Sequence, residues 1–137
     1  MDDVLLNKVS SIERCLKRIR EEYQGAEDKL GSDYTRQDAI VLNLLRAAEA
    51  AINAAMHVVR IKKLGVPQHS REAFVLLEDN GLLAHSLSQR MQAMVGFRNI
   101  AVHDYQKISL PILRSILENH LTDFEQYAQK MIALASE

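Results

Sequence analysis

Three side chains that suit phosphodiester chemistry lie in one short segment, at Arg98, His103 and Tyr105. A guanidinium can bind a phosphate through paired hydrogen bonds and stabilise the charge that grows on its oxygens in the transition state. An imidazole with an ordinary pKa of about 6.5 can take the proton of a ribose 2′-hydroxyl or give one to the departing 5′-oxygen. The chemistry that this set suits best is cleavage of RNA without a metal ion.

A single histidine does not easily serve as base and acid in the same turnover. In-line attack by the 2′-hydroxyl needs a base on one side of the phosphorus and an acid on the other. A two-fold dimer that brings two copies of the segment face to face supplies both groups. The chemistry therefore predicts a homodimer.

The segment RNIAVHDY at residues 98–105 resembles the R-x4-H-x-Y signature of the HEPN superfamily, and specifically of its HepT toxins. These toxins are the nuclease halves of toxin–antitoxin pairs. The asparagine after the arginine, the tyrosine two residues after the histidine, and the position between the last two expected helices make the resemblance specific. It extends over the whole chain.

This resemblance implies a helical bundle that dimerises and acts as the toxin of a type VII-like toxin–antitoxin system, a metal-independent endoribonuclease. It assigns Arg98 and His103 to catalysis and Asn99 to a supporting role. Tyr105 looks like the tyrosine to which the cognate MNT-type nucleotidyltransferase antitoxin transfers AMP. RNA cleavage would need no cofactor, whereas the antitoxin would use ATP and Mg²⁺. AMP on the phenol would add bulk and negative charge to a cleft that must admit an anionic backbone.

Arg98 stands at a position where the helical pattern predicts an apolar residue. Leu87, Met91 and Met94 face inward, and the next inward position is 98. The arginine must therefore extend to the surface along its methylenes or meet an anionic partner. His103 lies five residues on, about 140° around an unbroken helix, so the two side chains converge only if the helix ends or bends between them. The sequence from Asn99 to Ser109 makes such a break plausible.

Apolar residues spaced alternately by three and four define the elements that carry this segment. One helix is expected from Leu5 to a point before Gly31, and a second begins at Thr35, with Asp38 as a weak capping box, and ends at Lys62–Gly65. A short helix capped by Ser70 stops at Asn80–Gly81, and a fourth helix begins near Ser86. A last helix is capped by Ser109 and continues through His120 to Leu134.

The fold predicted from these elements is all-α, an antiparallel up-and-down bundle of four main helices plus one short helix in one domain, residues 1–137.

Seventeen Lys and Arg against 18 Asp and Glu give a net charge of −1, so any contact with RNA must be local. Cys15 is the single cysteine, which excludes an internal disulfide and fits a reducing compartment. No apolar stretch is expected to span a bilayer, which favours a cytoplasmic protein without membrane contact.

The remaining polar residues offer few other sites. His120 and Asp123 could share a metal ion, but His120 lies on an apolar stripe, so no metal site is predicted. His69 and His85 are expected to be exposed loop histidines. A polar stripe on the second helix is expected to face solvent, with a minor alternative in which it lines the dimer cleft and touches RNA; it comprises Arg46, Glu49, Asn53, His57 and Arg60.

Two other functions remain open at this point. The first is a non-catalytic helical module that binds a nucleotidyltransferase partner or its substrate, although such a module has no need of both Arg98 and His103. The second is a purely structural scaffold in which Arg98 forms a buried ion pair with Asp104.

Overall fold

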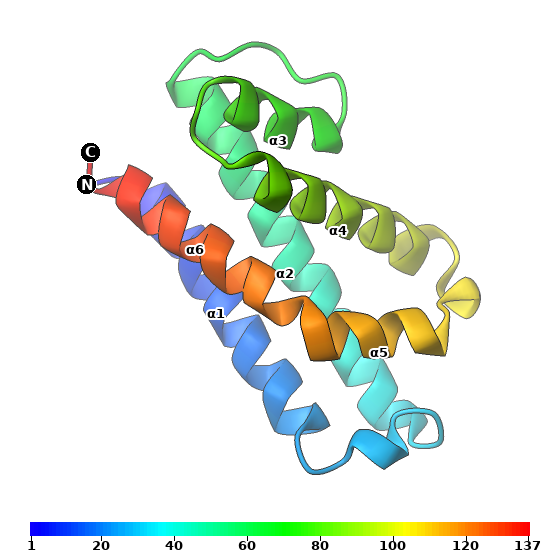
Figure 1. Ribbon diagram of the computed structural model, residues 1–137. Helices are drawn as coiled ribbons and strands as arrows, with labels where there is room; N and C mark the ends of the chain where they lie inside the picture. Colours follow the sequence, from blue (N-terminus) through cyan, green and yellow to red (C-terminus); the bar gives the residue numbers. More distant parts are fainter.

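The computed structural model describes residues 1–137 and is built entirely from helices (Figure 1). The predicted all-α antiparallel bundle is confirmed. Its six α-helices and two short 3-10 turns follow in the order α1 (Asp3–Tyr23), η1 (Glu27–Lys29), α2 (Tyr34–Ile61), α3 (Ser70–Asp79), α4 (His85–His103), η2 (Tyr105–Lys107), α5 (Leu110–Asn119) and α6 (Leu121–Ala135).

Polar side chains fix where several of these helices begin. The Asp2 carboxylate accepts a hydrogen bond from the amide of Leu5 at 3.0 Å, and the Ser109 hydroxyl caps α5 as predicted. The cap of α2 is Asp33, whose side chain accepts from the amide of Arg36, so the start predicted at Thr35 is one residue late. Ser70 does not cap α3; its hydroxyl has another partner, described below.

The long helices α1 and α2 form an antiparallel pair, and α6 runs back along α1 so that the two chain ends meet (Figure 1). The amide of Asp2 donates to the carbonyl of Ala135 at 3.0 Å. One cluster of 39 buried apolar residues joins the helices. At its centre the Tyr127 ring packs edge-on against Phe74, and its hydroxyl donates to the carbonyl of Ala51 at 2.8 Å, which satisfies the buried phenol.

The last predicted helix is two helices. The chain breaks at His120, where φ is −123° and ψ is 0°, so α5 ends at Asn119 and α6 begins at Leu121. The imidazole Nδ1 of His120 lies 2.9 Å from an Asp123 oxygen and the Arg90 guanidinium pairs with the other, so these groups join the break to α4. The apolar spacing continues across the break, which is why the sequence pattern did not reveal it.

Helix α2 is long and apolar enough to cross a membrane by length and composition alone, contrary to the prediction that no stretch would be. More than half of its most apolar window is buried inside the bundle. The helix contacts α1, α3, α4 and α6, and a helix enclosed on several sides needs apolar residues around most of its circumference. Its composition follows from its central place (Figure 1).

Candidate active site

Arg98 lies on α4 and reaches two other helices. Its Nη1 donates to Oε1 of Glu49 on α2 at 2.8 Å, and its Nη2 donates to the hydroxyl of Ser70 on α3 at 2.9 Å. The side chain is 21% exposed and lies at the edge of the core. Of the two possibilities for an arginine at this apolar position, Arg98 therefore takes the second and pairs with an anionic residue. The proposed ion pair with Asp104 is absent, because Asp104 pairs instead with Lys107 at 3.2 Å.

The two partners fix the direction of the guanidinium. Charge-assisted hydrogen bonds to a carboxylate are stronger than neutral ones, and Arg has a planar fork that restricts the geometry of such bonds. Glu49 and Ser70 hold one terminal nitrogen each, while the buried Nε has no partner. The result is a cation oriented by three helices before any ligand binds.

His103 is the last residue of α4 and is exposed, with no hydrogen bond or ion pair to another side chain. Helix α4 runs unbroken from Arg98 to His103 and ends there, so the break expected between Asn99 and Ser109 follows His103 at Asp104 and does not lie between the two side chains. Five helical steps place the two residues about 140° apart around the axis and about 7.5 Å apart along it. Within one chain, therefore, the helix does not turn the two side chains toward each other.

Asn99 is exposed and lies beside Arg98 on a shallow pocket of about 410 Å³ between the start of α3 and the middle of α4. His69, Ser70 and Arg71 from the α3 side complete its polar lining. The terminal nitrogen of Arg71 reaches over Gly96, where a β-carbon would stand 2.8 Å from it. The pocket thus holds two arginines, of which sequence reasoning had identified only one.

Tyr105 begins the 3-10 turn after α4, and its hydroxyl donates to Asp38 on α2. Burial, and after it the hydrogen bond to Asp38 and the negative charge of Asp38, together raise the pKa of this phenol to about 12. The phenol is thus protonated at neutral pH while the residue remains 40% exposed. Tyr105 lines a separate hollow of about 270 Å³ with Gln37 and Val41.

The polar stripe of α2 divides into two parts. His57 is buried, with Nε2 at 2.7 Å from the Asp2 carboxylate and Nδ1 at 3.1 Å from the Arg60 guanidinium, so the prediction of a solvated face is wrong for this residue. The backbone bond from Leu5 and then the bond from His57 lower the pKa of Asp2. Arg46, Glu49 and Asn53 instead line a groove between α1 and α2.

The sequence pointed to the motif residues but not to the residues that bind them. Glu49 was assigned to a solvated face, Ser70 to a helix cap and Asp38 to a capping box, yet these three residues hold Arg98 and Tyr105. All three belong to helices far away in sequence from the motif. To predict the Arg98–Glu49 pair, one would need information that matches a charged residue of α4 with an opposite charge on α2. A single sequence does not contain that information.

The chain matches a known protein family over most of its length. The family described as Ribonuclease HepT-like matches residues 12–131 of the chain. The chain belongs to the HepT-like ribonuclease family. The resemblance stated from the RNIAVHDY segment is therefore confirmed, and the chain is an enzyme of the ribonuclease class.

Relatives in this family are similar over nearly their full length. The mRNA nuclease HepT of Shewanella oneidensis is 46% identical over 127 residues, which cover 93% of this chain and 95% of the relative. A solved structure of the tri-AMPylated Shewanella oneidensis HEPN toxin in complex with MNT antitoxin is 44% identical, with a TM-score of 0.92 and coverage of 97% and 99%. A solved toxin–antitoxin structure with AMP-PNP has the same identity and TM-score, with coverage of 96% and 99%.

Proposed function

We propose that the chain is the toxin of a toxin–antitoxin pair and cleaves RNA without a metal ion through Arg98 and His103. The observation that carries the proposal is the contrast within α4: an arginine held by Glu49 and Ser70, and five residues on an exposed histidine with no intramolecular partner. A fixed cation suits a phosphate, and a free imidazole suits proton transfer. The mRNA nuclease HepT is the relative that supports this reading.

Cleavage follows in one displacement at phosphorus. The Arg98 guanidinium binds the non-bridging oxygens and stabilises their growing charge, and Asn99 beside it supports the same phosphate. One His103 takes the proton of the 2′-hydroxyl as the new O–P bond forms. A second imidazole gives its proton to the 5′-oxygen as the old bond breaks. The products are a 2′,3′-cyclic phosphate and a free 5′-hydroxyl.

The second imidazole comes from a second copy of the chain. The helix separates Arg98 from His103 within one chain, and each chain has one histidine in the motif. A two-fold axis near the end of α4 would bring both motif segments to one phosphate. Ile100 and Val102 are exposed there, at 44% and 52%, and supply apolar area for such contact. The functional unit in this account is a homodimer.

Tyr105 is the site at which the partner silences the toxin. The phenol oxygen attacks the α-phosphorus of ATP held with Mg²⁺ by an MNT-type nucleotidyltransferase, AMP is attached and pyrophosphate leaves. Asp38 already accepts the hydrogen bond of this hydroxyl and is positioned to receive its proton. The complex of the tri-AMPylated HEPN toxin with MNT antitoxin supports this step. Both RNA and the ATP that the partner uses are available in the cytoplasm, where we place the activity.

The test is an RNA cleavage assay with purified protein in the presence of a strong chelator. The wild-type chain should cleave RNA, and the single substitutions Arg98→Ala and His103→Ala should each slow cleavage by about 10²–10⁴-fold. His85→Ala is the matched control, since His85 is exposed and lies outside the motif. Cleavage by His103→Ala at the wild-type rate would overturn the catalytic assignment. Wild-type protein that binds a nucleotidyltransferase but never cuts RNA would favour the non-catalytic module.

A further inference from the structure

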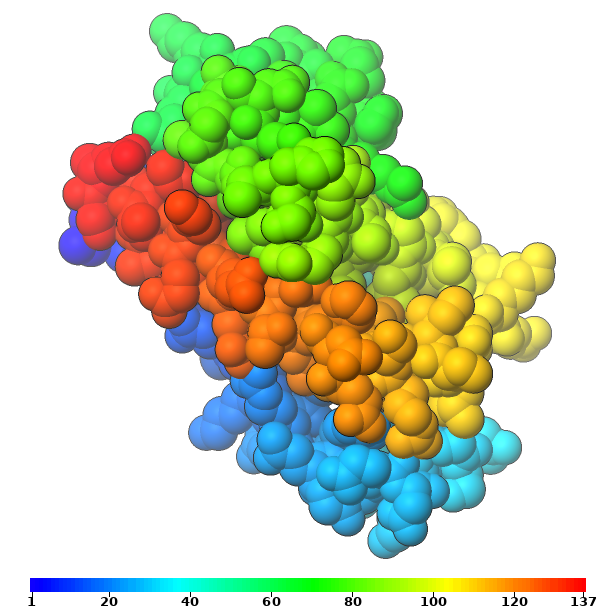
Figure 2. All heavy atoms as spheres, viewed as in Figure 1, coloured from blue at the N-terminus to red at the C-terminus, as the bar shows by residue number.

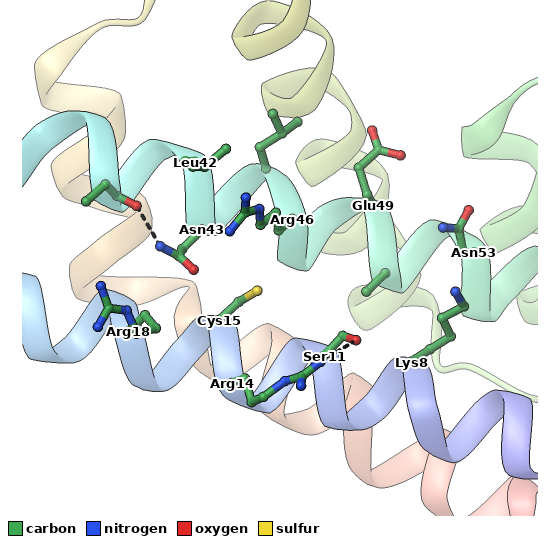
Figure 3. A pocket seen from close by; sticks show the side chains of 13 residues that line it. Lys8, Ser11, Arg14, Cys15, Arg18, Leu42, Asn43, Arg46, Glu49 and Asn53 are labelled. Atoms are coloured by element: carbon green, nitrogen blue, oxygen red, sulfur yellow. Dashed lines mark hydrogen bonds between the residues drawn. The ribbon is translucent and has the colours of Figure 1, made fainter.

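The antiparallel helices α1 and α2 leave a surface groove of about 810 Å³ between them (Figure 3). We call it the α1–α2 groove. Lys8, Arg14 and Arg18 line it from α1, and Arg46 lines it from α2. Figure 3 shows Lys8, Arg14 and Arg18 on α1 and Arg46, Glu49 and Asn53 on the neighbouring α2.

The cations of the α1–α2 groove have no acidic partners. Eleven ion pairs are found in the structure, and none of them includes Lys8, Arg14, Arg18 or Arg46. The three arginines are exposed and Lys8 is half-buried. The chain as a whole has a net charge of −1, so this cluster is a local excess of positive charge. Four cations facing one groove repel each other, and a bound polyanion would relieve that repulsion.

Glu49, the acidic residue of the α1–α2 groove, connects it to the motif. Its Oε1 accepts from Nη1 of Arg98 at 2.8 Å, so its charge is already matched by the motif arginine. The same carboxylate lines the groove and holds the group that we assign to phosphate binding. The groove therefore opens beside the proposed site of cleavage.

We propose that the α1–α2 groove binds the backbone of single-stranded RNA and leads it to Arg98. This inference rests on the proposed function and names the surface that captures the substrate. A rise of about 1.5 Å per residue places Lys8 and Arg18 about 15 Å apart along α1, a length over which several phosphates can bind. Arginine forks match phosphate oxygens in pairs, and a concave groove admits a strand but not a flat membrane surface. Asn53 adds an exposed amide for sugar or base edges.

Binding of RNA to protein that cannot cut it tests the α1–α2 groove separately from catalysis. The background is His103→Ala, and the probe is a single-stranded RNA oligonucleotide titrated at several salt concentrations. Arg14→Gln with Arg18→Gln removes two groove cations. Lys17→Gln with Lys130→Gln is the matched control, because it removes the same charge from exposed, unpaired lysines that do not line the groove. Thermal unfolding and sedimentation of each variant report folding and oligomeric state.

We expect the Arg14 and Arg18 double variant to bind RNA at least tenfold more weakly and the control to bind as the background does. The slope of log affinity against log salt should become shallower by about 1.4, since each contact to a single strand contributes about 0.7. Equal affinity and slope in both double variants would overturn the proposal. A change in oligomeric state without a change in RNA binding would assign the groove to a second copy of the chain and also overturn it. Failure of the wild type to cleave RNA would overturn the proposed function but not RNA binding in the groove.

Discussion

The two ends of the motif on α4 are built in opposite ways. Arg98 is held by Glu49 and Ser70 from two neighbouring helices, whereas His103 stands exposed at the end of the helix with no partner. The overall shape places this end of α4 at the periphery of the molecule, next to the turn that carries Tyr105 (Figure 1, Figure 2). In the proposed mechanism, a single chain therefore holds its phosphate-binding arginine in place, and a second copy of the chain would complete proton transfer.

The largest effect that this comparison predicts is on activity alone. His103→Ala should lower kcat by about 10²–10⁴-fold, the usual contribution of a general acid or base. The free energy of unfolding should change by no more than about 0.5 kcal/mol, because the side chain is exposed and makes no contact that stabilises the fold. Single-turnover cleavage and urea unfolding measure the two quantities. A loss of several kcal/mol of stability would contradict the claim that His103, unlike Arg98, makes no contact that stabilises the fold.

The next largest effect is expected from Arg98→Lys. Unlike His103→Ala, this substitution should lower both the cleavage rate and the free energy of unfolding. A lysine is a point charge and does not reproduce the two directed bonds to Glu49 and Ser70. We expect about 10²-fold slower cleavage and a stability loss of about 1 kcal/mol, because the pair is only partly buried. Cleavage and unfolding assays on the same preparation check both effects. Unchanged activity would show that any cation suffices.

Glu49→Gln tests whether Glu49 acts as a positioning residue through Arg98, to which it is hydrogen-bonded. The amide keeps one acceptor but loses the charge, so cleavage should fall by about tenfold. The effect should appear in kcat more than in KM and should disappear in an Arg98→Ala background, where there is no guanidinium left to orient. A tenfold loss from Glu49→Gln that persists on top of the residual rate of Arg98→Ala would instead point to a structural role.

The smallest effect concerns Tyr105. Asp38→Asn should lower the pKa of the phenol from about 12 while leaving it above 10, because burial, the larger cause, remains. The neutral phenol is the form that folding favours, so its contribution to stability is complete below pH 10 and is lost as pH rises toward 12. Ultraviolet titration of tyrosinate, with Tyr105→Phe to identify the band, measures the shift. An unchanged pKa would show that Asp38 does not influence the Tyr105 hydroxyl.

Helical periodicity predicted most of the bundle, because apolar spacing directly records which face of each helix is buried. It missed the division of the last helix at His120, since the stripe passes through the break without interruption. The polar stretch from Asn99 to Ser109 predicted a break in this region, but it did not fix the residue at which the helix ends, which is His103. The unbroken helix keeps Arg98 and His103 apart within one chain, which agrees with the proposal that two chains complete the site.

The residues that bind the motif side chains could not be predicted from the sequence, for a different physical reason. Arg98 at an apolar position signalled that an anion or solvent must receive its charge, but helical spacing carries no information about which residue of another helix stands opposite. Glu49 and Ser70 are 49 and 28 residues away. His57 was misjudged for the same reason, since its partner Asp2 is 55 residues away.

The central claim is that two chains supply the base and the acid to one phosphate. Wild-type and His103→Ala chains can be mixed, unfolded and refolded together so that dimers form at random, and RNA cleavage is then measured in chelator against the wild-type fraction. If both histidines are needed, the rate should follow the square of that fraction, so that an equal mixture retains about a quarter of the activity. A rate proportional to the wild-type fraction, about half in the equal mixture, would show that each chain cuts independently and would contradict the composite site.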